Sequence, residues 1–380
     1  MLGSMMQRDA RVVHVRRSWS SCVEFNAEVE GAPAGARVFL PGTELRALAL
    51  TDLVGDVEVG THVRLDCSAL AKNLGTGGFA TTLSCSTLPE DRVPEVGHIV
   101  KARYMPHQPV VLAVEEQGSP HRAVMEDADS LDGMVVVGAD LHSALPIIAH
   151  SARTTGEQLR IAYVMDDTAA LPAALSRLVV DCRDKGLVDT VITAGQSFGG
   201  DLEAASIPSA LLAARHVAGA DVAIVAPGPG NLGTGTRWGF SGTRLADTFH
   251  VTAALGGRPV ATVRASAADP RVEHRGISHH TRDVLTVLTH VAVRVAVPDL
   301  SPVDETSVDV EVRKMMNRHI AELRTRHQVD DVDWTECVDT VRSCPVALCS
   351  MGRSPEDDPL AFTCAAAAGV SAARLVVTTE

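Results

Sequence analysis

From Met134 onward, short apolar runs alternate with longer amphipathic segments, and this alternation constrains the fold more than any other feature of the chain. Short apolar runs predict buried strands, whereas apolar residues at helical spacing predict helices. Repeated strand–helix units form a mainly parallel sheet with helices on both faces. We therefore predict a doubly wound α/β domain over residues 134–380. The predicted strands are Met134–Val137, Leu159–Met165, Val188–Thr193, Asp221–Ala226, Pro259–Arg264 and Val293–Val297.

The segments between and after these strands predict the helices of the domain. The tail from Asp330 to Glu380 is expected to be a further α/β piece that completes the sheet. The predicted helices are Ser143–Ala152, Ala169–Lys185, Asp201–Ala218, Ser241–Leu255, Ser278–Val291 and Lys314–His327.

The region before this domain has a different pattern. Residues 9–117 contain short alternating runs punctuated by Gly, Pro and Asn, which indicate a small β-rich, barrel-like domain over residues 1–117. The polar segment 118–133 is expected to be a linker. A glycine-rich segment, Asn73–Gly78, lies inside the β-rich region, and either a tight turn at a barrel corner or a functional loop would explain it.

Charge and hydropathy exclude some classes of partner. The net charge is −13 and the chain has no basic run with interleaved aromatics, so we expect no nucleic-acid binding. No apolar run approaches about 18 residues, so we expect no membrane span. The start of the chain lacks an apolar signal core, and the eight cysteines form no Cys-x-x-Cys pair. Reduced thiols in a cytoplasmic protein are therefore expected.

A glycine-rich loop follows the predicted strand Asp221–Ala226. Glycine lets a backbone turn sharply near a ligand, and free N–H groups with threonine hydroxyls suit a phosphate or another anion. The loop contains a formal Gly-x-Gly-x-x-Gly, but the next helix begins late, so dinucleotide binding is a minor alternative. A structural turn that lets two helices approach is another. The predicted ligand-binding residues are Gly228, Gly230, Gly233, Thr234, Gly235 and Thr236.

Polar residues collect where the predicted strands end, and this is the main argument for a site, because ligands of open α/β sheets bind at that edge. Carboxylates and imidazoles gathered there suit acid–base catalysis or a divalent metal, which is a candidate cofactor of unknown identity. Each residue also has a structural explanation, such as capping a helix. The predicted catalytic residues are Asp140, His142, Asp201, Glu203 and His279, with Asp166 and His274 in the same set.

Two details of this set limit the prediction. His279 and His280 are adjacent, so on a helix their side chains point about 100° apart. We therefore do not expect the two histidines to bind the same metal ion. Arg275 and Arg353 are candidates to pair with an anionic substrate.

Several of these segments carry a family resemblance. The chain resembles the uncharacterised bacterial family known as domain of unknown function 3866, and the resemblance implies a cytoplasmic protein with this two-part layout but assigns no catalytic residue. The matching segments are Asn73–Gly78, Gly97–Pro106, Phe198–Ala204, Pro227–Thr236, Gly276–Thr281, Met351–Arg353 and Glu356–Asp358.

Three functions remain open at this point. The first is an enzyme, such as a metal-assisted hydrolase or transferase, that acts on a small phosphorylated or otherwise anionic ligand held by the glycine-rich loop. The second is a sensor or regulator that binds a nucleotide-like ligand without catalysis. The third is an interaction scaffold, and a homodimer is one candidate assembly.

Overall fold

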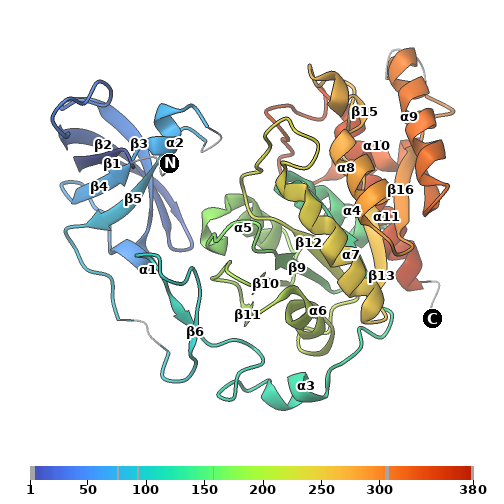
Figure 1. Cartoon of the computed structure of the whole chain (residues 1–380), viewed down its shortest axis with the longest axis horizontal. Helices are drawn as coiled ribbons and strands as arrows, with labels where there is room; N and C mark the ends of the chain where they lie inside the picture. Colours follow the sequence, from blue (N-terminus) through green and yellow to red (C-terminus); the bar gives the residue numbers. More distant parts are fainter. Residues whose placement is uncertain (1–4, 75–76, 92–93, 157, 304–307, 378–380) are drawn as a thin grey trace. The chain divides into compact units, whose positions relative to one another are not determined.

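The computed structural model describes residues 5–74, 77–91, 94–156, 158–303 and 308–377, and it divides into two compact units (Figure 1). The first unit contains the chain up to Glu95 together with Tyr104–Pro109 and Ala174–Val180. The second contains Val96–Arg103, Val110–Ala173 and the chain from Asp181 onward. Residues 118–133, the expected linker, therefore lie within the second unit and include the short helix α3 (Arg122–Asp127).

The first unit is a closed five-stranded barrel with the strand order β1-β2-β3-β5-β4. Neighbouring strands are antiparallel except for β3 and β5, which are parallel. This is the strand order of an OB-fold barrel. Alternate residues point inward, such as Phe25, Ala27 and Val29 of β2, which agrees with the alternation in the sequence. The strands are β1 (Gln7–Trp19), β2 (Cys22–Gly31), β3 (Glu44–Leu50), β4 (His62–Asp66) and β5 (Ala80–Cys85).

The Asn73–Gly78 segment belongs to this unit, but it includes Gly75 and Thr76, which lie outside the described residues. Both explanations of that segment therefore stay open.

The second unit is built on an eight-stranded parallel sheet with the order β11-β10-β9-β12-β8-β13-β16-β17. The central strands are buried along their whole length, because helices cover both faces. All six predicted strands are present, and the tail adds β17 at one edge. The strands are β8 (Val135–Gly138), β9 (Ile161–Met165), β10 (Thr190–Ala194), β11 (Leu202–Ala204), β12 (Val222–Ala226), β13 (Arg258–Thr262), β16 (Arg294–Asp299) and β17 (Gln328–Asp333).

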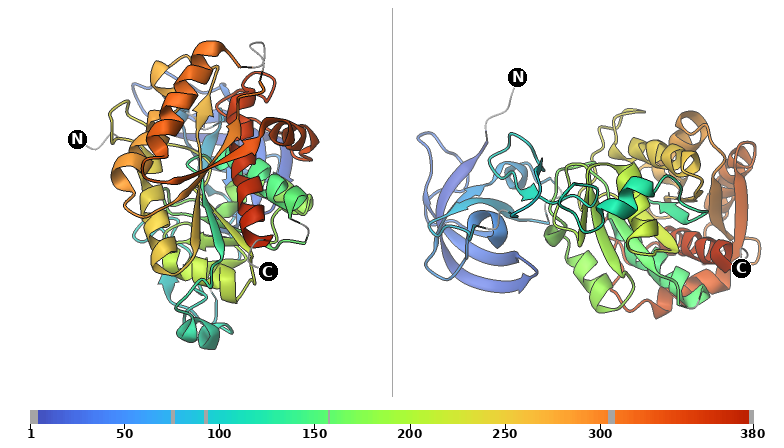
Figure 2. Two further views of the ribbon diagram at one scale, coloured as in Figure 1. Left: turned by 90° about the vertical axis from the view of Figure 1, so that its right-hand side faces the viewer. Right: turned by 90° about the horizontal axis from the view of Figure 1, so that it is seen from below.

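Helices lie on both sides of this sheet, as Figure 2 shows. The chain runs from β8 past β12 to β9 in one direction and from β12 past β8 to β13 in the other. Because such crossovers are right-handed, their helices α4 and α7 cover opposite faces. α10 and α11 pack with α4, whereas α6 packs with α7. These helices are α4 (Leu145–Thr155), α6 (Ile207–His216), α7 (Arg244–Ala254), α10 (Trp334–Ser343) and α11 (Pro359–Val377).

The remaining elements are short, apart from α9 (Val310–Leu323), and three of them form the rim beside the ends of the central strands. A two-stranded ribbon, β14 (Ala265–Ser266) with β15 (Gly276–Ile277), continues from β13, and α8 (His279–Asp283) follows β15. The others are α1 (Thr51–Val54), α2 (Ser68–Ala71), α5 (Arg177–Asp184), β6 (Ile99–Val100) and β7 (Val110–Val111).

The predicted helix Asp201–Ala218 is wrong at its start. Leu202–Ala204 form the edge strand β11, and helix α6 begins only at Ile207. Pro208 in the first turn and the side chain of Ser206, which accepts a hydrogen bond from the N–H of Ser209, fix that start. Asp201 is therefore not a helix cap.

Helix α11 fills the core against one face of the sheet. Its alanines and Gly369 let it approach α4 closely, because a Cβ added at Gly369 would lie 2.2 Å from the carbonyl oxygen of Ile148. Among the described residues α11 is the one helix long and apolar enough to cross a membrane, yet 72 % of its most apolar window is buried. Such burial is what a core helix of a folded domain requires.

Candidate functional site

The central strands β9, β12, β8 and β13 place polar residues at their carboxyl ends. Asp166 follows β9, Asp140 lies two residues beyond β8, and Arg264 lies two residues beyond β13. The loops after β8 and β12 leave toward opposite sides of the sheet, since β8 leads to β9 and β12 leads to β13. A crevice forms at such a reversal, and ligands of this fold class bind there.

The glycine-rich loop after β12 is largely exposed from Gly230 to Trp238, and it closes on itself. The N–H of Thr234 donates to the carbonyl oxygen of Gly239 at 2.8 Å, and the hydroxyls of Thr234 and Thr236 lie 2.9 Å apart. Gly228 is different, because an added Cβ would lie 2.6 Å from Cε of Met165, so packing against β9 explains this glycine.

Both halves of this loop are attached to the rim of the sheet. The side-chain amide of Asn231 donates to the carbonyl oxygen of Asp140 at 2.8 Å. The guanidinium of Arg237 donates to the carboxylate of Asp283 in α8 at 2.8 and 3.0 Å. The loop therefore extends from the end of β8 to α8.

Asp140, Arg264 and His280 meet under this loop. The guanidinium of Arg264 lies 3.5 Å from the Asp140 carboxylate and 3.4 Å from Nδ1 of His280. The Asp140 side chain is 8 % exposed and that of Arg264 is 11 % exposed. Burial raises the pKa of Asp140 above its ordinary value, and Arg264 only partly opposes this effect.

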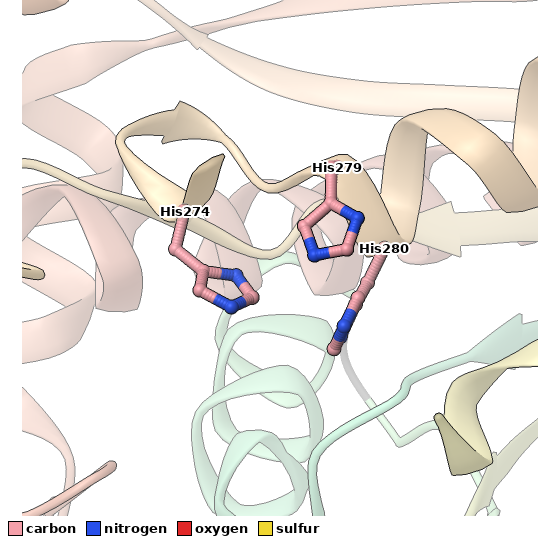
Figure 3. A group of neighbouring side chains, drawn as sticks. All are labelled: His274, His279 and His280. Carbon is pink, nitrogen blue, oxygen red and sulfur yellow. The ribbon is translucent and has the colours of Figure 1, made fainter. Parts of the chain in front are cut away.

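Three histidines, His274, His279 and His280, surround one small space beside Arg264, and we call them the histidine cluster (Figure 3). Their ring centroids are 5.1 Å (His274 to His279), 4.9 Å (His274 to His280) and 4.3 Å (His279 to His280) apart. The expectation that the rings of His279 and His280 diverge is therefore not met. His279 is the first residue of α8, which continues directly into the π-helical segment Val284–Leu288, and the side-chain torsions of the two histidines bring their rings together.

Neighbouring groups hold each ring of the histidine cluster. Nδ1 of His274 lies 2.8 Å from the hydroxyl of Ser278, which also caps α8, and Nδ1 of His279 lies 3.6 Å from the Asp283 carboxylate. The ring of His280 stacks on Phe240 with centroids 3.7 Å apart. The histidine cluster is thus built by one short segment, His274–Asp283, together with Phe240 from the glycine-rich loop region.

Two members of the histidine cluster are neutral at pH 7. Burial, followed by the charge of Arg264, lowers the pKa of His274 to about 4 and that of His280 to about 3. A neutral imidazole keeps a lone pair on one nitrogen and a proton on the other, so it can bind a cation or donate a hydrogen bond.

His142 lies at the same edge of the sheet, and its contacts are structural. Its Nδ1 is 3.0 Å from the carbonyl oxygen of Pro227 and 3.2 Å from the hydroxyl of Tyr163. Burial lowers the pKa of His142 to about 4, so it is neutral and donates to Pro227. His142 therefore ties the loop after β8 to the ends of β12 and β9.

Asp201 and Glu203 lie elsewhere. Asp201 directly precedes the short edge strand β11 and Glu203 lies within it, and β11 is four strand spacings from β8, or about 19 Å at 4.8 Å per spacing. Asp201 accepts from the N–H of Val191 at 2.8 Å and pairs with Arg183. The structure thus separates both residues from Asp140 and the histidine cluster.

Glu203 forms a buried ion pair with Lys101, which is fully buried. The Lys101 ammonium lies 3.2 Å from the carboxylate and donates to the carbonyl oxygens of Ser197 and Ala204 at 3.1 and 3.0 Å. Glu203 also accepts from Thr193 and from the N–H of Gly199. Burial raises the pKa of Glu203, while Lys101 and these donors lower it.

Sequence reasoning missed Arg264, Phe240 and Asp283 and excluded His280 as a partner of His279. Arg264 was the last residue of the predicted strand Pro259–Arg264, and its place at a strand end was the available signal, since the other strand-end residues were found by that rule. Arg353, expected to meet a substrate, instead lies 3.2 Å from Asp358 and 3.4 Å from Asp269. Arg275 donates to the carbonyl oxygen of Ala267 at 3.4 Å.

Comparison with known proteins gives one match. A family model described as "Protein of unknown function (DUF3866)" matches residues 46–369, which include the second half of the barrel and the whole eight-stranded sheet. No curated protein and no solved structure matches the chain.

Proposed function

The chain belongs to the DUF3866 family of proteins of unknown function, so its function has to be inferred from the residues of its own candidate site. We propose that it is an enzyme acting on a small phosphorylated or otherwise anionic ligand. The ligand would bind at the carboxyl edge of the sheet, between the glycine-rich loop and the histidine cluster. The reaction class that fits these groups is hydrolysis or group transfer.

The position of Arg264 is the observation that supports this proposal. Its guanidinium is nearly buried, yet its two near neighbours lie at 3.5 and 3.4 Å, longer than the 2.7–2.9 Å of a strong charge-assisted hydrogen bond. A planar guanidinium recognises phosphate or carboxylate with two parallel hydrogen bonds. An anion beside Arg264 would therefore gain stronger hydrogen bonds than the protein itself supplies.

Asp140 supports catalysis rather than binding alone. Its carboxylate lies 3.5 Å from Arg264, and its raised pKa brings proton transfer closer to neutral pH. A carboxyl group next to a bound anion would act as general acid or base. A non-catalytic sensor is the second candidate, favoured by the Arg237–Asp283 contact through which a ligand on the loop would act on α8.

Anion binding tests the first part of the proposal. Titration calorimetry with inorganic phosphate and pyrophosphate should detect binding by the wild-type chain. Arg264→Gln should weaken it at least tenfold, about 1.4 kcal/mol, because the charged fork is lost. Arg244→Gln is the matched control, because Arg244 pairs with Asp167 in a different groove of the same unit. Equal loss in both variants, or no binding by the wild type, would contradict the proposal.

Asp140→Asn separates an enzyme from a sensor. A panel of phosphate esters, followed by phosphate release, should reveal turnover by the wild type, and the variant should lose at least 100-fold in kcat while its phosphate affinity stays within about threefold. Binding without turnover of any panel member, unaffected by Asp140→Asn, would favour the sensor.

We also infer that the protein works in the cytoplasm. All eight cysteines lie in the described part of the chain and are free thiols, five of them buried. Free thiols persist in a reducing compartment, where disulfides are rare. Fractionation of the cells that express the protein, with an antibody against the chain, tests this inference, and recovery in an oxidising compartment would contradict it.

A further inference from the structure

We infer that the histidine cluster, His274, His279 and His280, is a binding site for one divalent transition-metal ion of the zinc class. This inference rests on the proposed function and deepens it, because the metal would lie where the anionic ligand is expected. The three imidazoles would be the protein ligands, and a fourth position would be open to water or the anion.

The geometry of the cluster is close to that of a three-histidine zinc centre. One nitrogen of each ring lies within 4.8 Å of the corresponding nitrogens of the other two (Figure 3). Tetrahedral zinc with Zn–N bonds of about 2.05 Å places ligand nitrogens about 3.3 Å apart and ring centroids about 5.2 Å apart. The centroid separations of 5.1 and 4.9 Å are close to this value, whereas the 4.3 Å between His279 and His280 is shorter, so these two rings would have to reorient when the metal binds.

Groups outside the cluster orient two of its rings as metal sites require. A ligating histidine usually makes a hydrogen bond from its other nitrogen to a carboxylate or another oxygen, which fixes the ring. Ser278 serves His274 at 2.8 Å, and Asp283 lies 3.6 Å from Nδ1 of His279. These contacts leave the second nitrogen of each ring for the shared space.

The donor set selects the class of metal. Three imidazoles without a carboxylate in contact suit Zn²⁺ and its neighbours Co²⁺, Ni²⁺ and Cu²⁺, whereas Ca²⁺ and Mg²⁺ prefer oxygen ligands. Three protein ligands also leave one position for water or substrate, the arrangement of catalytic rather than structural zinc. The side chain of His279 is 22 % exposed, so an ion can reach the cluster from solvent.

Arg264 makes this site conditional on an anion. A guanidinium only donates, so its contact with Nδ1 of His280 at 3.4 Å competes with a metal for that ring, and its charge repels the cation. Asp140, 3.5 Å away, offsets one of these charges. An anion bound between the metal and Arg264 would offset the remaining positive charge. The metal should therefore bind the anion-loaded protein more tightly than the free protein, and the anion should bind the metal-loaded protein more tightly than the free protein.

The first measurement is the metal affinity of the untagged full-length chain. After treatment with a chelator, competition against a chromophoric chelator should show one Zn²⁺ per chain, and Co²⁺ should give the visible absorption bands of a tetrahedral nitrogen site. His279→Gln and His280→Phe should each weaken Zn²⁺ binding at least 100-fold, because two imidazoles remain. His280→Phe keeps an aromatic ring stacked on Phe240, so the variant is expected to fold.

Two further variants make the result decisive. His290→Gln is the matched control, because His290 stacks on His250 at 6.0 Å without a third histidine, and it should leave Zn²⁺ affinity unchanged. Arg264→Gln should weaken phosphate binding at least tenfold but tighten Zn²⁺ binding about tenfold. Wild-type Zn²⁺ affinity that stays weaker than about 100 µM even with phosphate present, or Zn²⁺ binding that persists in both cluster variants, would overturn the metal site. Phosphate binding that survives without metal would leave the proposed function standing.

Discussion

Two buried clusters of charged and polar groups in the second unit, one around Lys101 and Glu203 and one around Arg264 and His280, differ in how completely their partners satisfy them. Lys101 and Glu203 are surrounded by carbonyl oxygens, a hydroxyl and an N–H, all at 3.2 Å or less. Arg264 and His280 are also buried or half-buried, but the contact between them is 3.4 Å long and the histidine nitrogens face one another.

The lengths of the hydrogen bonds around a buried polar group therefore help to distinguish a structural role from a functional one. A buried charge with a full set of short hydrogen bonds has its desolvation cost offset within the protein, so it needs no ligand. A buried cation and neutral imidazoles with long contacts keep hydrogen-bonding capacity for another molecule. Residue type does not distinguish the two, since both clusters contain a carboxylate, a cation and backbone oxygens nearby.

The largest effect that would test this comparison is expected at Lys101. Lys101→Met leaves Glu203 buried without its cation, and breaking a buried pair in this way costs about 3–5 kcal/mol of unfolding free energy. Urea unfolding of the variant measures the loss, and metal and phosphate binding should persist below the transition. Lys185→Met, an exposed lysine, should change stability by less than about 0.5 kcal/mol.

The double variant Lys101→Met with Glu203→Gln sharpens this result. Removal of the second charge should restore at least about 1 kcal/mol, because the uncompensated carboxylate is then gone. A single variant that loses less than about 1 kcal/mol would show that the pair is not what stabilises β11.

An intermediate effect is expected at His142, which lies near the site but has the contacts of the structural cluster. Its pKa is about 4 in the folded chain and about 6.5 unfolded, so the unfolded state binds more protons between these values. Stability from His142 is present above pH 6.5 and falls by up to about 3 kcal/mol as the pH drops toward 4.

His142→Asn removes this titration while Nδ2 of asparagine can still donate to Pro227. Unfolding free energies measured from pH 7 to 4.5 should then fall less steeply, by up to about 1.4 kcal/mol per pH unit. If the slope is unchanged in His142→Asn, His142 would instead have to be counted with the functional residues around Arg264.

The smallest effect is expected at His280. His280→Phe removes a contact of 3.4 Å with Arg264 and keeps the stacking on Phe240, so unfolding free energy should change by less than about 1 kcal/mol in either direction. Functional residues often lower stability or leave it unchanged. A loss as large as that of Lys101→Met would end the distinction between the two clusters.

The sequence predicted most of the sheet, because strands buried on both faces appear as continuous apolar runs. β11 was missed, since three residues next to a helix carry no such run. The strand-end rule found Asp140, and it failed for Glu203 because the order of strands is not visible in the sequence. The pairing of Lys101 with Glu203 joins residues about 100 positions apart, which no local pattern records.

The histidine cluster was only partly predicted for a related reason. Helical spacing separates the Cα–Cβ directions of adjacent residues by about 100°, but side-chain torsions can still bring two adjacent rings together. His279 begins α8, and Phe240 from the glycine-rich loop holds the ring of His280 in place. The position of that loop depends on tertiary contacts such as Arg237 with Asp283.

The place of α11 has a consequence for how the protein is made. This helix covers β8, β13 and β16 and packs on α4, although its residues, Pro359–Val377, are translated more than 200 positions after β8. While the ribosome is still adding these residues, the apolar side of the central strands and of α4 has no cover. The nascent chain should therefore bind chaperones late in translation, and the sheet can complete its folding only after α11 has left the exit tunnel.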